Sequence, residues 1–166
     1  MIIHGQLMGR DQIKRAKKLG AYISFFIAHI PHWGDVHIKN FGMERAAYIS
    51  AAGTAGREGV NYTFHQDTPV LPPDMPETMS AAVNRRTSSG VLLGESEKIS
   101  TLDALKAVTL NAARQYGEES ERGSIEEGKA ADFCLLSADP LEVKDDEIKH
   151  IKVISLYKSA EEYRIN

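Results

Sequence analysis

Short apolar runs and helix-like patterns alternate along the first part of the chain. The apolar runs carry few polar residues, which is typical of strands buried on both faces of a parallel sheet. Between the first two runs, Ile13, Ala16 and Leu19 recur at helical spacing. The pattern predicts strands at 1–3, 21–28 and 60–64, helices at 11–19 and 43–57, and a polar loop at 29–42. This order predicts parallel βαβ units with right-handed crossovers, and therefore an α/β fold.

The second part of the chain changes character twice. Residues 68–76 hold four of the six prolines, so this segment is predicted to be an extended loop. Helical spacing returns at 78–86 and 100–116. The tail then has the patterns of two strands, at 132–136 and 148–157, and the first of these is apolar enough to predict burial.

Composition and charge exclude several classes of partner. The chain has 166 residues, 42% hydrophobic and 26% charged, with a net charge of −3. So small and mixed a charge leaves no basic stripe for nucleic acid and no patch for anionic lipid. No run approaches the roughly 18 apolar residues of a membrane span, and a cytoplasmic location is predicted. The single cysteine, Cys134, lies among apolar residues and is predicted to be buried rather than nucleophilic.

Side chains that bind metals follow each predicted parallel strand. His4 ends the first strand, His29 follows the second, and His65 and Asp67 follow the third. Because the carboxyl ends of parallel strands meet at one edge of a sheet, these groups are expected to converge there. Imidazole and carboxylate suit zinc and related ions, so the pattern indicates a metal site. The spacing leaves a second interpretation open, in which the histidines are hydrogen-bonded core or surface residues.

The segment 123–136, GSIEEGKAADFCLL, resembles the C-terminal signature of metal-dependent amidohydrolases, TIM-barrel hydrolases that carry a small β-sandwich domain. Further motifs resemble, in order, the branch that includes the formamide deformylases. They are Ile2-Ile3-His4, Trp33-Gly34-Asp35, His65-Gln66-Asp67-Thr68-Pro69-Val70, Thr109-x-Asn111-Ala112-Ala113 and Asp139-Pro140-Leu141. The resemblance extends over residues 2–158, which is essentially the whole chain.

The resemblance implies a divalent metal, with zinc as the expected ion, and an amide-type small molecule as the substrate. It makes His4 the metal ligand that ends the sixth barrel strand. It makes Asp67 a metal ligand at the end of the eighth strand, where the aspartate also takes the proton from metal-bound water. The residues that it places toward the substrate are His29, His32, Trp33 and His65. The sequence leaves open a second role for the loop histidines, as buried side chains bonded to the backbone.

The same resemblance implies that part of the catalytic site is missing. The family's His-x-His pair, the bridging lysine or glutamate of the fourth strand and the histidine of the fifth have no counterpart here. The implied fold is a partial TIM barrel, its last three βα units, at 1–122, followed by the C-terminal β-sandwich strands at 123–166. Such a chain is expected to be inactive alone, as part of a hydrolase that cleaves C–N bonds of amides, formamides or cyclic amides.

Two further expectations follow from this interpretation. A non-catalytic interaction or regulatory module, derived from an amidohydrolase, is the alternative function. A three-stranded sheet without the rest of its barrel has exposed edges at 1–4 and 60–64, and unpaired edges favour association. The chain is therefore predicted to form a homo-oligomer.

Overall fold

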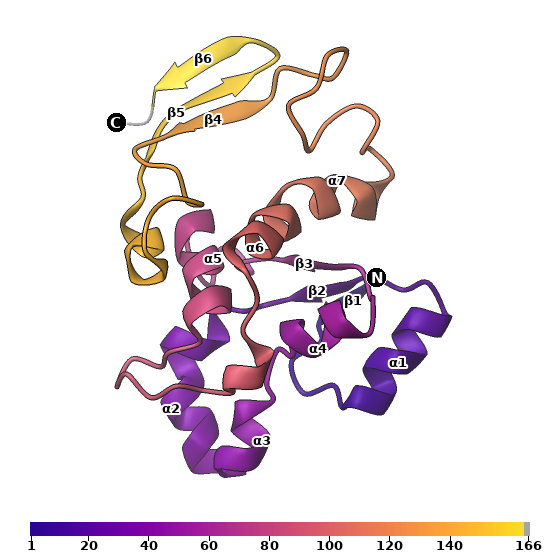
Figure 1. Cartoon of the computed structure of the whole chain (residues 1–166), viewed down its shortest axis with the longest axis vertical. Helices are drawn as coiled ribbons and strands as arrows, with labels where there is room; N and C mark the ends of the chain where they lie inside the picture. The colour runs from indigo at the N-terminus through magenta and orange to yellow at the C-terminus, as the bar shows by residue number, and fades with distance from the viewer. Residues whose placement is uncertain (165–166) are drawn as a thin grey trace.

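The computed structural model describes residues 1–164, which form two three-stranded sheets and the helices around the first of them (Figure 1). The predicted α/β fold is confirmed. In chain order the elements are β1 (Ile2–His4), α1 (Arg10–Lys18), β2 (Ile23–Phe25), α2 (His29–Phe41), α3 (Met43–Ala47), α4 (Ala52–Arg57), β3 (Tyr62–Phe64), α5 (Met75–Asn84), the 3₁₀ helix η1 (Glu95–Glu97), α6 (Thr101–Val108), α7 (Leu110–Tyr116), β4 (Phe133–Leu136), the 3₁₀ helix η2 (Asp145–His150), β5 (Val153–Lys158) and β6 (Glu161–Arg164).

The first sheet is parallel, with β2 between β1 and β3. Ser24 in β2 pairs with Ile3 on one side and with Thr63 on the other. Helix α1 connects β1 to β2, and α2, α3 and α4 connect β2 to β3, so both connections are helical crossovers as predicted. Every residue of β2 and β3 is buried, which explains why these runs are largely apolar.

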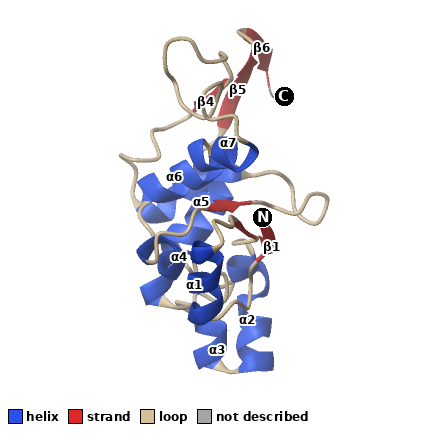
Figure 2. Ribbon diagram, turned by 90° about the vertical axis from the view of Figure 1, so that its right-hand side faces the viewer, coloured by secondary structure: helices blue, strands red, loops and turns tan. Residues whose placement is uncertain are grey.

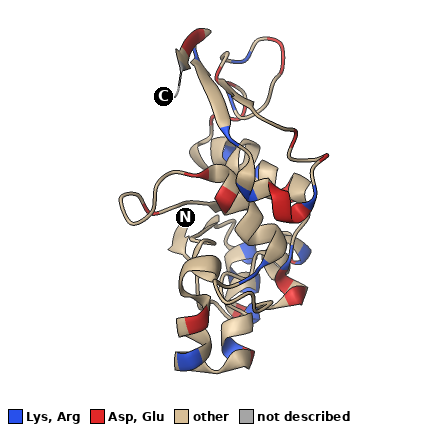
Figure 3. Ribbon diagram, turned by 90° about the vertical axis from the view of Figure 1, so that its left-hand side faces the viewer, with Lys and Arg blue, Asp and Glu red and all other residues tan. Residues whose placement is uncertain are grey.

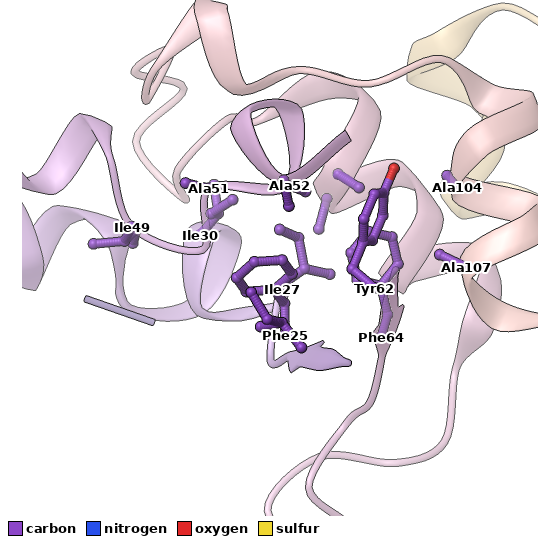
Figure 4. Close-up of a cluster of buried hydrophobic side chains, with 14 of the residues drawn as sticks. Phe25, Ile27, Ile30, Ile49, Ala51, Ala52, Tyr62, Phe64, Ala104 and Ala107 are labelled. Carbon is purple, nitrogen blue, oxygen red and sulfur yellow. The ribbon is translucent and has the colours of Figure 1, made fainter. Parts of the chain in front are cut away.

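The main core lies between this sheet and its helices. Phe25 and Tyr62 have ring centroids 6.2 Å apart, and Phe64 lies 5.7 Å from Tyr62. Figure 4 shows these rings together, with Ala104 and Ala107 of α6 nearby. Both alanines are fully buried, and their small side chains allow α6 to approach β3 closely.

The prediction of a polar loop at 29–42 is wrong, because this segment forms α2. Pro31 lies in the first turn, where a backbone N–H has no partner within the helix, so proline is tolerated there. Gly34 is required by packing rather than by a turn, since a Cβ at this position would lie 2.5 Å from Cγ2 of Thr87. Pro31 and Gly34 are therefore both compatible with a helix.

Two segments predicted as single helices are each divided. Between α3 and α4, Ser50 has a φ of 46°, and its N–H donates to the carbonyl of Gln6 at 2.9 Å. Between α6 and α7, Thr109 has φ −125° and ψ −93°. Apolar residues continue on both sides of each break, so the periodicity alone does not reveal it.

The second sheet, β4-β5-β6, is antiparallel and lies at the opposite end of the molecule from α2 and α3 (Figures 1 and 2). The predicted burial of 132–136 is wrong, because Phe133 and Leu135 remain 42% and 53% exposed. Cys134 is likewise exposed. An apolar strand is buried only where a second layer packs on it, and these side chains are not covered within residues 1–164.

The tail is attached to the helical body through η2 and α5. Ile148 of η2 is fully buried, and the side-chain amide of Asn84 donates to the carbonyl of Asp145 at 2.7 Å. Lys and Arg residues are interspersed with Asp and Glu along the ribbon (Figure 3). Among the described residues, no helix has both the length and the apolar character to cross a membrane.

Candidate functional site

His4 ends β1 in a strained turn at the carboxyl edge of the parallel sheet. Its φ is 63°, and the N–H of Gly5 donates to the carbonyl of Ile3 at 2.9 Å, which closes a three-residue turn around His4. Glycine is needed next to it, because a Cβ on Gly5 would lie 2.5 Å from Cγ2 of Ile23. A non-glycine residue with this backbone costs about 1–3 kcal/mol, and such residues often belong to functional sites.

Asp67 has a similar backbone at the end of the neighbouring segment. It follows β3, its φ is 55°, and its carbonyl accepts from the N–H of Val70 at 2.8 Å. The side chains of His4 and Asp67 are 41% and 43% exposed. Both predicted metal ligands therefore leave the sheet at the same edge and remain accessible to a ligand.

His4, His65 and Asp67 converge at this edge. One potential ligand atom from each residue lies within 4.8 Å of the other two. His4 Nε2 is 4.0 Å from Asp67 Oδ2, and His4 Nδ1 is 3.1 Å from His65 Nε2. His65 Nδ1 is in turn 2.9 Å from Ser24 Oγ. The Ser24-His65-His4 chain thus fixes the ring of His4 with its Nε2 toward Asp67.

The surroundings keep His65 neutral at pH 7. Burial lowers the pKa of His65, and the neighbouring His4 lowers it further, whereas Asp67 opposes the shift. A neutral imidazole has one nitrogen that accepts and one that donates. His65 is therefore suited to a hydrogen-bonded chain that orients another histidine.

The ring of Phe26 lies at the centre of an aromatic cluster beside these residues. It is 2% exposed, and the ring centroids of His29, His65, Trp33 and His4 lie 4.7, 5.5, 5.9 and 5.9 Å from its own. Three of the four residues predicted to face the substrate therefore lie around one apolar side chain.

His32 lies apart from this cluster. Its Nε2 is 2.9 Å from Glu77 Oε1, and both residues line a cavity of about 450 Å³ with Asn84 and Asp146. The ring centroids of His32 and Trp33 lie 5.4 Å apart. Its role in substrate binding stays a prediction.

His37 and Gln6 belong to the same region, and the sequence did not point to them. His37 Nε2 is 3.2 Å from His29 Nδ1 and 3.0 Å from the amide nitrogen of Gln6. His37 lies eight residues after His29, so the two share one face of a helix. The eight-residue spacing has this meaning only in a helix, so it gave no indication while the segment was predicted to be a loop.

Burial also controls the charge of this pair. Burial, and then the neighbouring His37, lowers the pKa of His29 to about 4, and burial lowers the pKa of His37. His29 is therefore neutral at pH 7. Phe41 stacks on His37 with ring centroids 5.6 Å apart and an interplanar angle of 8°, which holds the second ring in place.

Comparison with known proteins places this geometry in a family. The sequence profile of the Amidohydrolase family matches residues 1–161. The chain belongs to the amidohydrolase family. Among curated relatives, the N-substituted formamide deformylase of Arthrobacter pascens is 34% identical over 99 residues, which are 60% of this chain and 18% of the relative. YtcJ of Bacillus subtilis (strain 168) is 28% identical over 158 residues, 92% of this chain and 29% of the relative.

Solved structures agree with the assignment to the amidohydrolases. An uncharacterized metal-dependent hydrolase from Pyrococcus horikoshii OT3 is 30% identical, with a TM-score of 0.73 over 87% of this chain and 30% of its own. An amidohydrolase from Thermotoga maritima MSB8 is 22% identical, with a TM-score of 0.64 over 99% of this chain and 37% of its own, and so shares the fold. This amidohydrolase chain spans less than a third of the length of the curated relatives it matches.

The donor atoms of this amidohydrolase fit a divalent metal. Nitrogen and oxygen ligands lie about 2.0–2.2 Å from a zinc ion, so two ligands of one tetrahedral ion are roughly 3.4 Å apart. The 4.0 Å between His4 Nε2 and Asp67 Oδ2 differs from this by a small side-chain movement. The bond from His4 Nδ1 to His65 is the kind of contact that orients a histidine ligand.

Proposed function

We propose that this chain supplies the His4 and Asp67 side of a metal-dependent centre that hydrolyses a C–N bond of an amide, formamide or cyclic amide. The observation that carries the proposal is the convergence of two residues with strained backbones, one at the end of each outer strand of the sheet, on one accessible point. The similarity to an N-substituted formamide deformylase and to a metal-dependent hydrolase of known structure supports the same chemistry.

Each residue has a distinct role in this proposal. His4 Nε2 and one Asp67 oxygen hold the ion, for which zinc suits the donor set best. His65 Nε2 accepts a hydrogen bond from the Nδ1–H of His4, and the Nδ1–H of His65 donates to Ser24 Oγ, so that the ligating Nε2 of His4 carries no hydrogen. When bound, the ion would acidify water and polarise a carbonyl. The Asp67 carboxylate accepts a proton at the oxygen that the ion leaves free.

The proposal extends to the architecture. Residues 1–122 correspond to three βα units of a TIM barrel, and 123–166 to strands of a β-sandwich. In this arrangement β1 and β3 are unpaired edges, which supports self-association through the sheet. The alternative of a non-catalytic interaction module has no comparable observation in its favour among residues 1–164.

Calorimetric titration of the full chain with Zn²⁺ at pH 7 tests the proposal. We expect one binding event, weak because few ligands are present, that weakens at least tenfold in His4→Ala and in Asp67→Ala. His150→Ala and Asp146→Ala are matched controls, since both residues are exposed on η2, away from the sheet edge. Absence of zinc binding, or equal weakening in the controls, would remove the basis of the proposal.

A further inference from the structure

The hydrogen bonds among Gln6, His37 and His29 define which nitrogen carries each proton. The Gln6 amide nitrogen, 3.0 Å from His37 Nε2, can only donate, so His37 Nε2 accepts. The same His37 Nε2 lies 3.2 Å from His29 Nδ1. In the tautomer that accepts from Gln6, this nitrogen has no hydrogen, so His29 Nδ1 carries one and the two donors share the single lone pair of His37 Nε2. Since His29 is neutral, its remaining nitrogen, Nε2, is a hydrogen-bond acceptor.

This arrangement leaves a costly group inside the protein. If His37 Nε2 accepts, its Nδ1 carries the hydrogen, and that atom is buried without a hydrogen-bond partner. A buried unpaired donor costs about 1–3 kcal/mol. A phenylalanine would fill the same space and stack on Phe41 without this cost. An imidazole at position 37 is therefore explained by what its other nitrogen does.

His29 is not a member of the group that fits the metal. Within the described part of the chain, the cluster with metal-binding geometry consists of His4, His65 and Asp67. His29 nevertheless lies beside it, because His29 and His65 contact the same ring of Phe26. His29 is half-buried, and its ring thus brings an acceptor nitrogen to the neighbourhood of the proposed centre.

We propose that His37 and Gln6 are positioning residues that hold His29 as its Nδ1–H tautomer, so that His29 Nε2 accepts the N–H of an amide-type substrate. This inference rests on the proposed function for the location of the substrate. An acceptor cannot bind a carbonyl oxygen, so it selects substrates that keep a hydrogen on nitrogen. The site then distinguishes primary and secondary amides from tertiary amides and esters, because the latter leave this acceptor unpaired.

Nitrogen-15 NMR of the histidine rings in the full chain at pH 7 tests the tautomer. We expect His29 to have a protonated Nδ1 and an unprotonated Nε2, with the assignment made from the signals lost in His29→Gln. In His37→Phe, which keeps the ring stack, His29 should shift toward the Nε2–H form that a free imidazole favours. Gln6→Glu replaces the donor by an acceptor of the same shape and should also drive His29 to Nε2–H.

The controls separate this inference from structural damage and from the metal proposal. His150→Phe, at an exposed position, should leave the signals of His29 unchanged. An Nε2–H form of His29 in the unmodified chain, or an Nδ1–H form that survives both His37→Phe and Gln6→Glu, would overturn the proposal that His37 and Gln6 hold the tautomer of His29. Zinc affinity should change less than twofold in His37→Phe. If zinc does not bind at all, the proposed function fails while the tautomer result stands.

A pair of small probes tests the substrate class. N-methylformamide has an N–H, and N,N-dimethylformamide lacks it. We expect N-methylformamide to shift the His29 Nε2 resonance at concentrations where N,N-dimethylformamide does not, and this difference should vanish in His37→Phe. Equal shifts from both probes, or no shift from either, would overturn the assignment of His29 Nε2 to a substrate N–H.

Discussion

Replacing the buried guanidinium of Arg85 should destabilise the protein more than most single substitutions. Arg85 is fully buried at the C-terminus of α5. It donates to the carbonyls of Leu93 at 2.7 Å, Ile49 at 2.9 Å, Ser50 at 3.2 Å and Ala47 at 3.3 Å. Burial lowers its pKa to about 10, so it remains charged at pH 7. The side chain therefore joins the end of α5 to the break between α3 and α4.

The size of the effect follows from what Arg85→Met leaves behind. Four carbonyls lose their donor, and a hydrogen bond from a charged donor contributes about 1.5–3 kcal/mol. Removal of the charge recovers part of its desolvation cost, and loss of one partner in a buried charged network costs about 3–5 kcal/mol overall. For a chain of this size that corresponds to a fall in Tm of roughly 6–20 °C. Arg85→Lys should lie in between, because one ammonium cannot reach all four carbonyls.

Urea unfolding followed by circular dichroism at pH 7 measures this change. Arg86→Met is the matched control, because Arg86 is exposed and donates only to the Gly90 carbonyl at 2.9 Å. The control should change the free energy of unfolding by less than about 0.5 kcal/mol. If Arg85→Met stayed within 1 kcal/mol of the unmodified chain at an unchanged m-value, the reasoning about the four carbonyls would be refuted.

Two further substitutions test the packing and the charge of the fold. The carboxylate of Asp35 accepts hydrogen bonds from Ser89 and Ser88, which lower its pKa to about 2. The stability that the ionised carboxylate contributes is therefore present above about pH 4 and lost as the pH falls toward 2. The difference in Tm between the unmodified chain and Asp35→Asn should shrink over that range and not at higher pH. In Gly94→Ala, the new Cβ would lie 1.9 Å from the Ala47 carbonyl oxygen at a φ of 78°, so thermal unfolding should show a loss of more than about 2 kcal/mol in the free energy of unfolding. Gly20→Ala is the control: with a φ of 61° and open space around the new Cβ, it should lose only about 1 kcal/mol.

The parallel sheet could be predicted because its strands are buried on both faces. The largely apolar runs at 21–28 and 60–64 have no helical period, and the connection between them is too long for a hairpin. Convergence of His4 and Asp67 then followed from strand direction alone. The structure adds the positive φ at both residues, which depends on local packing that no pattern of polarity contains.

The errors share one physical cause, which is that tertiary contacts decided what local sequence left ambiguous. Residues 29–42 were predicted as a polar loop, yet they form a helix that accepts Pro31 in its first turn and uses Gly34 for close contact with Thr87. Missing α2 concealed His37, because its relation to His29 depends on helical phase. Cys134 looked buried because its neighbours are apolar, but burial requires a covering layer that residues 1–164 do not provide.

Some strained residues of this chain are explained by the fold, and others are not. Positive φ at Ser159 occurs in the turn between β5 and β6, and at Arg85 it ends a helix, so both follow from chain geometry. Arg85 also donates four hydrogen bonds to carbonyls, which compensate its burial. His4 neither caps a helix nor joins paired strands, and His37 retains a buried donor without a partner. His4 and His37 thus each carry a cost that chain geometry does not explain, and a ligand at the carboxyl end of β1 would offset the strain at His4.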